Sequence, residues 1–296
     1  MLRGETVIPF TDLPKPLAFV LSGGVALGAI QVGMARAAYE QGFRPDFLIG
    51  SSVGALNAAY LGQGLSEARI DRLAEIWRGL TRKDVFGNLG LRRITLLLSE
   101  PLALASPETF QQLIASHIPI SGAQLEFPVH TVATDYLSGE IVISSGGDLR
   151  QNLIASCAIP FVFPPVLIGG RHLVDGSVAA HVPLLPAARL GARTLVVFDV
   201  GFPCKLSELP RSPLERTLHV FSILLHRQPT GSLSALTKDV TVLYLPSPCP
   251  LSVPTYDFSQ GEALVRAGYE TARNYLSALR IPGPGIYGQP HSHATY

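Results

Sequence analysis

The sequence has little charge and no marked excess of either sign. Of its 296 residues only 15% are charged, and 23 basic residues offset 22 acidic ones to leave a net charge of +1. A net charge this close to zero produces no overall electrostatic field that would attract a polyanion, so we expect no nucleic-acid partner. The scarcity of charge, together with 47% hydrophobic residues, predicts a folded chain with a large buried core.

Cysteines are also few, and they are far apart. The sequence contains only Cys157, Cys204 and Cys249. An odd number of cysteines, without a C-x-x-C pair or a Cys/His ligand spacing, indicates neither a disulfide framework nor a structural zinc site. Nucleotide-binding fingerprints are missing as well. The third position counted from Gly23 is Val25, which breaks a dinucleotide-binding turn, and no Lys-Ser/Thr pair follows. We therefore expect no metal and no cofactor.

We expect neither a secretory leader nor a membrane span. The first 16 residues carry four charged residues and three prolines, unlike the apolar region of a signal peptide. The apolar stretch at residues 17–38 is interrupted by Ser22, a glycine pair and Gln31. It fits a buried strand, loop and helix better than a membrane span. We therefore expect a cytoplasmic protein.

Short apolar runs alternate with helical periodicity along most of the chain. This alternation is typical of an α/β fold with a largely parallel sheet. We expect strands at residues 17–21, 47–49, 129–133, 141–144, 194–200 and 240–245. We expect helices at residues 28–41, 53–61, 148–157 and 262–279.

Residues 17–280 show no internal repeat and no clear linker, so we expect them to form one domain. An N-terminal extension at residues 1–16 precedes it. Residues 66–118 carry seven basic residues among leucines and isoleucines, and we expect a helical, cap-like insertion there. The tail at residues 281–296 is rich in proline and glycine, and we expect it to be disordered.

Two adjacent serines lie between glycines in "GSSVG", residues 50–54. The pentapeptide fits G-x-S-x-G with Ser52 at its centre, between a predicted strand and a predicted helix. A nucleophile in this position sits on a sharp turn, which Gly50 and Gly54 allow because they carry no Cβ. The dipole of the following helix favours negative charge at the site. Ser52 rather than Ser51 is therefore the candidate nucleophile, although a plain strand-to-helix turn can have the same pattern.

A second glycine-rich turn precedes this elbow. Gly23 and Gly24 follow the first predicted strand, and a helix is expected from Gly28. Backbone N–H groups in such a loop can converge on an oxyanion because no side chain blocks the approach. Neighbouring parallel strands would bring the loop and Ser52 to the same edge of the sheet. The alternative is a tight turn without a catalytic role.

A serine nucleophile needs a base to remove its proton. All eight histidines follow Ser52 in the sequence, and none lies in a persuasive catalytic loop; His181 is the best candidate for a Ser-His-Asp triad. A carboxylate is the other choice, and Asp175 precedes Gly176 at the end of a short apolar segment. An Asp-Gly pair is also common in ordinary turns, so the residues alone leave the base open.

The glycine loop, the elbow and the Asp-Gly turn occur in an order that resembles the patatin-like phospholipase family. The resemblance extends from about Leu17 to Leu279 and includes the connecting stretches "ATDYLSGE" and "ASCAIPFVFPPV". It implies a three-layer α/β/α sandwich with a mostly parallel central sheet. It further implies a Ser–Asp dyad without a catalytic histidine, which hydrolyses fatty acyl esters through an acyl-enzyme.

The resemblance assigns a role to each candidate residue. Ser52 is the nucleophile, Asp175 is its base, and an oxyanion hole is formed by backbone N–H groups. The hole comprises Gly23, Gly24 and Val25, and the remaining motif positions are Gly28, Gly50, Gly54 and Gly176. The implied partner is an acyl-lipid substrate. The basic insertion has two interpretations: it contacts a membrane surface peripherally, or it is a helical hairpin with solvated arginines. We prefer the helical hairpin.

Two positions depart from the family pattern. Val25 stands where a third consecutive glycine is common, and its Cβ is expected to narrow the site or to hold φ below zero. Leu27 stands where the family often has an arginine or lysine. Without this positive charge, the expectation that the substrate is specifically a phospholipid is weaker. Two alternatives therefore stay open: a catalytically silent lipid- or fatty-acid-binding protein of the same fold, and a histidine-dependent α/β-hydrolase.

Overall fold

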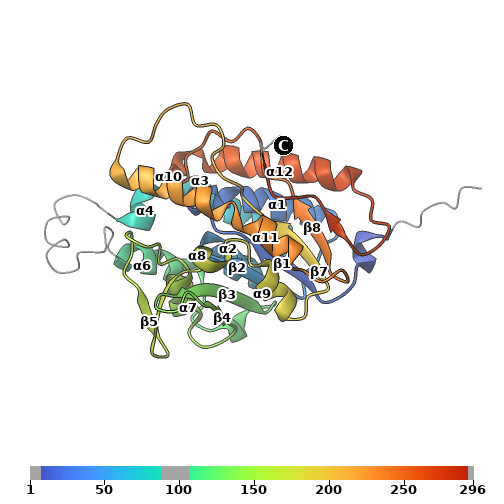
Figure 1. Ribbon diagram of the computed structural model, residues 1–296, viewed down its shortest axis with the longest axis horizontal. Helices are drawn as coiled ribbons and strands as arrows, with labels where there is room; N and C mark the ends of the chain where they lie inside the picture. Colours follow the sequence, from blue (N-terminus) through green and yellow to red (C-terminus); the bar gives the residue numbers. More distant parts are fainter. Residues whose placement is uncertain (1–7, 88–106, 293–296) are drawn as a thin grey trace, which may run out of the picture.

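A central sheet forms the middle layer of the protein (Figure 1). The computed structural model describes residues 8–87 and 107–292. Within them the sheet has nine strands, paired in the sequence β5-β6-β3-β2-β1-β7-β8-β9, with β4 also paired to β3. The strands are β1 (Leu17–Leu21), β2 (Phe47–Ser51), β3 (Val129–Asp135), β4 (Ile141–Ser144), β5 (Val166–Ile168), β6 (Arg171–Asp175), β7 (Thr194–Phe198), β8 (Thr241–Leu245) and β9 (Ile286–Tyr287).

Most of the sheet is parallel. Strands β3, β2, β1, β7, β8 and β9 pair in parallel, whereas β4 and β6 run antiparallel to β3, and β5 runs antiparallel to β6. Every residue of β1, β2, β7 and β8 is buried. Strands with apolar side chains on both faces must be shielded from water on both faces. In a parallel sheet the helices that connect successive strands provide this burial. The predicted α/β fold with a mostly parallel sheet is confirmed.

Helices cover both faces of the sheet, which gives three layers (Figure 1). One face packs against α1 (Ala29–Glu40), α2 (Val53–Gly62), α3 (Glu67–Gly79), α7 (Leu149–Ser156) and α12 (Gly261–Ala278). The other packs against α8 (Ser177–Ala180), α9 (Leu184–Arg189) and α11 (Gln228–Ser234). The remaining described helices are α4 (Arg82–Phe86), α6 (Pro107–His117) and α10 (Pro213–Leu225), with short 3-10 turns at Phe10–Asp12, Val25–Gly28, Gly122–Gln124 and Phe258–Gln260.

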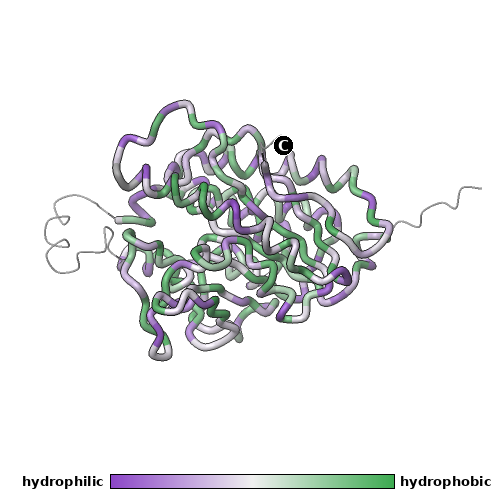
Figure 2. Tube along the Cα trace, in the orientation of Figure 1, coloured by the Kyte–Doolittle hydropathy of each residue, from purple (hydrophilic) through white to green (hydrophobic). Residues whose placement is uncertain are grey.

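The distribution of hydropathy follows these layers. In Figure 2 the hydrophobic chain lies in the interior strands, and hydrophilic stretches lie on the peripheral loops and outer helix turns. The last helix, α12, alternates between the two colours (Figure 2). It buries Leu264, Ala272 and Leu276 against the core, as expected for an amphipathic surface helix.

The predicted insertion at residues 66–118 contains α3, α4 and α6. Its apolar run "ITLLL" and the residues Arg92 and Arg93 lie outside the described residues. Trp77 of α3 and Phe110 of α6 are buried in the main core. The described part of this segment is therefore packed against the sheet domain.

The predicted disorder of residues 281–296 is wrong for the described part of this tail, residues 281–292. Ile281 is fully buried, and its carbonyl accepts a hydrogen bond from Ile8 N–H. Ile286 and Tyr287 then add β9 to the edge of β8. Proline and glycine argue against a helix, but an edge strand needs only a few main-chain hydrogen bonds, which composition does not reveal.

Candidate active site

Ser52 occupies the turn between β2 and α2, and its backbone is in the left-handed region with φ +53°. A non-glycine residue there is strained, as is typical of a residue held at a functional turn. The two flanking glycines are required by close packing. A Cβ on Gly50 would lie 2.3 Å from the carbonyl carbon of Gly54, and one on Gly54 would lie 2.4 Å from the oxygens of Leu21 and Ser22. The sharp turn predicted from G-x-S-x-G is therefore present.

Strand β3 brings Asp175 to this turn. On one edge of β3, the parallel strand β2 ends with Ser51 opposite Val132. On the same edge, the antiparallel strand β6 ends with Asp175 opposite Ala133, the next residue of β3. Strand β4 occupies the other edge at Ala133. The carboxyl ends of β2 and β6 thus meet head to head, although 123 residues separate Ser52 from Asp175 in the sequence.

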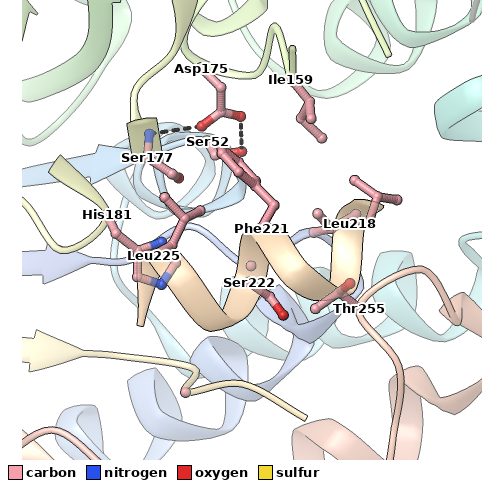
Figure 3. A pocket seen from close by; sticks show the side chains of 13 residues that line it. Ser52, Ile159, Asp175, Ser177, His181, Leu218, Phe221, Ser222, Leu225 and Thr255 are labelled. Atoms are coloured by element: carbon pink, nitrogen blue, oxygen red, sulfur yellow. Dashed lines mark hydrogen bonds between the residues drawn. The ribbon is translucent and has the colours of Figure 1, made fainter. Parts of the chain in front are cut away.

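Ser52 and Asp175 are joined directly by a hydrogen bond. Ser52 Oγ donates to Asp175 Oδ2 at 2.6 Å, and the other carboxylate oxygen, Oδ1, accepts from Ser177 N–H at 2.8 Å (Figure 3). Asp175 is 1% exposed. Burial raises its pKa to about 6, and the hydrogen bonds from Ser52 and Ser177 limit the rise. At neutral pH the carboxylate is ionised and can accept the serine proton.

The neighbouring serines have other partners. Ser51 Oγ donates to Ala180 O at 2.5 Å, so the Ser51 hydroxyl is engaged on the α8 side. Ser156 Oγ accepts from Ser52 N–H at 3.0 Å and donates to Val132 O at 2.6 Å. Ser156 therefore fixes the backbone of the turn to β3. Ser156 belongs to the connecting stretch "ASCAIPFVFPPV", but no catalytic motif marks it.

The glycine loop differs from the prediction at Gly23. Its N–H donates to His181 O at 3.0 Å, so it is not available to an oxyanion. Within the described residues the N–H groups of Gly24 and Val25 make no hydrogen bond, and both residues line a cavity with Ser52. The expectation that Val25 would hold φ below zero is wrong, because its φ is +52°. The loop keeps the glycine-like conformation despite the β-branched side chain.

The rest of the loop is held from behind by buried polar side chains. Gln31 Nε2 donates to the carbonyls of Ser22 and Phe198 at 2.8 and 3.0 Å. Asn57 of α2 donates to Gln31 Oε1 and accepts from Trp77 Nε1 at 2.9 and 3.0 Å. Such a satisfied network rigidifies its surroundings. The lone Gln31 within an apolar stretch was the only sequence signal of it.

In the part of the chain that the structure describes, Gly28, Leu27 and Gly176 do not contact Ser52 through hydrogen bonds, and each has a structural environment of its own. Asn57 Nδ2 also donates to Gly28 O at 3.0 Å, which anchors the end of the loop to α2. Leu27 is fully buried in the hydrophobic core and lines neither cavity at Ser52. At Gly176 a Cβ would lie 2.1 Å from Val132 O, so glycine is required where the chain leaves Asp175 and crosses β3.

His181, the rival base, does not contact the pair. No hydrogen bond joins it to Ser52 or Asp175 within the described residues. Its Nδ1 and the hydroxyl of Ser177 are both buried without a hydrogen-bond partner. Burial lowers the pKa of His181 to about 4, so the imidazole is neutral at physiological pH. Both groups line the cavity beside Ser52, where Figure 3 shows them facing the same space.

Two cavities meet at Ser52. We call the first the polar cavity; it contains Asp175, Ser177 and His181 and is closed by α10 through Leu218, Phe221, Ser222 and Leu225 (Figure 3). The second, the apolar cavity, runs from Ser52 between helices. Its lining comprises Val25, Val53, Leu56, Trp77, Leu80, Val85, Phe110, Leu113, Cys157, Ile159, Phe163 and Phe258.

A further hollow lies next to the apolar cavity. The two share the lining residues Leu56, Trp77, Leu80, Phe110 and Leu113, and the further hollow is also lined by Ile114, His117 and Ile118. Cys157 lines the apolar cavity together with Ser52. Burial, followed by the charge of Asp175, raises the pKa of the Cys157 thiol well above the ordinary range, so the thiol remains protonated.

Among the described helices, none combines the length and apolar character that crossing a membrane requires.

One family model matches the part of the chain that builds this site. The model, described as patatin-like phospholipase, covers residues 19–188. An uncharacterised NTE family protein of Mycobacterium tuberculosis is 30% identical over 185 residues, which are 62% of this chain and 49% of that protein. Human patatin-like phospholipase domain-containing protein 6 is 27% identical over 197 residues, which are 62% of this chain and 13% of that protein.

A solved structure shows a similar fold. VipD from Legionella pneumophila matches with a TM-score of 0.51 and 17% identity, over 90% of this chain and 67% of that one. A likeness at this identity concerns the fold alone. The matched region spans about half the length of the mycobacterial relatives and a smaller share of the mammalian ones.

Proposed function

Because the chain belongs to the patatin-like phospholipase family, we propose that it is a serine hydrolase that cleaves fatty acyl esters through a Ser52–Asp175 dyad. The observation that carries the proposal is the direct hydrogen bond of 2.6 Å between the serine hydroxyl and a buried carboxylate. The bond lies at the junction of a polar and an apolar cavity. This arrangement supports a serine nucleophile and a carboxylate base beside an apolar cavity.

In the proposed mechanism Asp175 takes the proton of Ser52 while Oγ attacks the ester carbonyl carbon. The carbonyl oxygen becomes an oxyanion, for which the N–H groups of Gly24 and Val25 are the donors. The C–O bond of the ester then breaks, and Asp175 returns its proton to the departing alcohol. Water, deprotonated by the same carboxylate, attacks the acyl-enzyme and releases the fatty acid and free Ser52.

The apolar cavity supports an acyl chain as the part of the substrate that is bound there. Its walls are formed almost entirely by aliphatic and aromatic side chains, and Trp77 and Phe110 separate it from a second apolar hollow that they also line. Burial of a methylene group in such surroundings contributes about 0.8 kcal/mol. The alcohol portion would lie in the polar cavity, where Ser177 Oγ and His181 Nδ1 are unpartnered and a hydroxyl could satisfy both.

A catalytically silent lipid-binding protein is the alternative from a different class. The same cavities would suit it, and the strained Val25 in the oxyanion loop is the feature that favours it. Lipid binding alone, however, does not need a serine held against a buried carboxylate. A histidine-dependent hydrolase has less support, because Ser52 bonds Asp175 directly and His181 bonds neither.

Hydrolysis of p-nitrophenyl esters of increasing chain length tests the proposal. We expect Ser52→Ala and Asp175→Asn to lower kcat/KM by about 10⁴-fold or more, with circular dichroism unchanged. Ser51→Ala is the matched control and should stay active, because the Ser51 hydroxyl donates to Ala180 O instead.

Labelling with a fluorophosphonate probe separates the alternatives. Reaction at Ser52 is expected in the native protein and not in Ser52→Ala. A protein that reacts with neither ester nor probe would be the silent binder. Loss of activity in His181→Ala with full activity in Asp175→Asn would instead establish the histidine mechanism.

A further inference from the structure

Three segments from distant parts of the sequence meet on the side of the molecule that carries β8 and β9. Cys204 lies in the loop after β7, Cys249 in the loop after β8, and His291 in the segment after β9. One ligand atom from each residue, two sulfurs and an imidazole nitrogen, lies within 4.8 Å of the others. We call these three residues the Cys-Cys-His cluster.

We propose that the Cys-Cys-His cluster binds a thiophilic divalent metal ion, with Zn²⁺ as the best match. Two thiolates and an imidazole are the ligand set that Zn²⁺ takes in tetrahedral sites, with a water in the fourth position when three protein ligands are present. Zn–S and Zn–N bonds of about 2.3 and 2.1 Å put the ligand atoms roughly 3.6 Å apart. The three ligand atoms, which lie within 4.8 Å of one another, would have to approach by at most about 1.2 Å to reach this geometry.

The surroundings of the cluster support such a site. Cys204 Sγ accepts a hydrogen bond from Leu251 N–H at 3.3 Å, an interaction that favours a thiolate. The ring of Phe202 packs on His226 and His291, with centroid distances of 4.4 and 6.1 Å. His226 Nε2 also hydrogen-bonds to the backbone oxygen of His291. Outer contacts of this kind orient a ligating histidine.

A bound ion would tie the C-terminal segment to two loops at the carboxyl edge of the sheet. Phe202 and His226 link the cluster to the end of α10, the helix that closes the polar cavity. The site would thus stabilise one wall of that cavity without taking part in chemistry at Ser52. The proposal does not rest on the proposed hydrolase activity.

The test uses full-length protein kept under a thiol-free reductant and stripped with a chelator. Titration with Zn²⁺ against a chromophoric chelator gives the stoichiometry, and Co²⁺ substitution reports thiolate ligation through its visible and near-ultraviolet spectrum. We expect one ion per chain, a sulfur-to-cobalt charge-transfer band, and a melting temperature that rises with free Zn²⁺.

Variants of the ligands identify the site. Cys204→Ser, Cys249→Ser and His291→Ala should each weaken Zn²⁺ binding by at least tenfold and reduce or remove the cobalt band. His172→Ala is the matched control, because His172 is an exposed imidazole on β6 outside the cluster, and it should bind as the native protein does.

Two outcomes would overturn the proposal. One is that native protein binds no stoichiometric Zn²⁺, or that binding is unchanged in Cys204→Ser and Cys249→Ser. The other is that Cys204 and Cys249 are recovered by mass spectrometry as a disulfide under the same reducing conditions, which would make the cluster a redox pair.

Discussion

The proposed role of Asp175 and its burial favour opposite protonation states of its carboxyl group. As the proposed base it must be ionised, but its burial favours the protonated form and raises its pKa to about 6. We therefore expect kcat/KM for a short-chain ester to be half-maximal near pH 6, to fall about tenfold per pH unit below it, and to reach a plateau above about pH 7. A pH profile with p-nitrophenyl butyrate measures this. A rate that does not change between pH 5 and pH 8 would rule out Asp175 as the titrating base.

The same residue should reduce the stability of the fold. Its pKa is near 3.8 in the unfolded chain and about 6 when folded, so the native state favours the proton. The stability from this group is complete below pH 4 and is lost as the pH rises through 6, a change of about 3 kcal/mol. Asp175→Asn avoids this loss, because the amide has the same shape and can still accept from Ser177 and meet Ser52.

We therefore expect Asp175→Asn to be inactive but more stable than the native protein at pH 8, by about 1–3 kcal/mol. Urea unfolding at pH 8 and pH 4 measures the difference, which should shrink at the lower pH. Equal stability of the two proteins at pH 8 would show that the buried carboxylate carries no such cost.

Val25 offers a second test of strain at a single residue. Val25→Ala removes side-chain contacts but keeps φ at +52°, whereas Val25→Gly also removes the steric cost of that conformation. We expect Val25→Gly to be more stable than Val25→Ala by about 1 kcal/mol in urea unfolding.

Ala26 is the control for this comparison because its backbone φ is not positive. There the order should reverse, with Ala26→Gly less stable than the native protein by about 0.5–1 kcal/mol. If Val25→Gly were also the less stable member of its pair, the loop would not be strained at Val25.

The sharp turns at the candidate residues were the part of the candidate site that the sequence could predict. Small residues around Ser52 and the Asp-Gly pair at Asp175 mark sharp turns, whose steric requirements are local. The occupied N–H of Gly23 could not be predicted, because its acceptor is the carbonyl of His181, 158 residues away. The left-handed φ of Val25 was missed for a related reason: the surrounding loop, held by Gln31 and Asn57, overrides a side-chain preference.

At the scale of elements, two helices cross without side chains between them. A Cβ on Gly33 of α1 would lie 2.0 Å from Val265 O in α12, and one on Gly268 of α12 would lie 2.3 Å from Ile30 O in α1. Both obstacles are backbone atoms, which cannot rotate away. The two helices can therefore approach this closely only because both positions are glycine.

We expect Gly33→Ala to lower the free energy of unfolding by about 2 kcal/mol or more, since α1 and α12 must separate to admit the methyl group. Thermal or urea unfolding measures it. Gly79→Ala is the matched control, because no atom lies within 4 Å of a Cβ there, and it should be neutral or slightly stabilising. A neutral Gly33→Ala would mean that the crossing is looser than the structure shows.

Strand β6 shows where element prediction failed. Periodicity indicated the parallel strands from their continuous apolar runs, for example β1 at Leu17–Leu21. The short antiparallel strands β5 and β6 are half-exposed, with Arg171 and His172 at the start of β6, and their sequence resembles a loop. Their direction also follows from pairing with β3, which no local pattern encodes.

At the scale of the whole molecule, the C-terminal segment closes the sheet. Removal of residues 281–296 would expose the edge of β8, delete the buried Ile281 and leave an unpaired strand edge. We expect this truncation to lower the melting temperature by at least several degrees and to promote self-association. Differential scanning calorimetry and light scattering, both with a chelator present to exclude any metal effect, measure the two results. A truncated protein that melts at the native temperature and stays monodisperse would contradict this role.

The Cys-Cys-His cluster illustrates the limit of sequence motifs at this scale. Its members are separated by 45 residues (249 − 204) and 42 residues (291 − 249). Metal motifs are recognisable when ligands share a local turn, and here each ligand comes from a different segment. Only the order of strands in the sheet brings them together.

The meeting of β2 and β6 on one edge of β3 has a consequence for how activity could be controlled. If Ser52 and Asp175 are the dyad, their separation is set by two consecutive residues of a single buried strand, Val132 and Ala133. No movement between domains or subunits could pull such a pair apart without unfolding the sheet. The dyad would be assembled as soon as the protein folds, and any on–off control would have to act on the admission of substrate to the cavities.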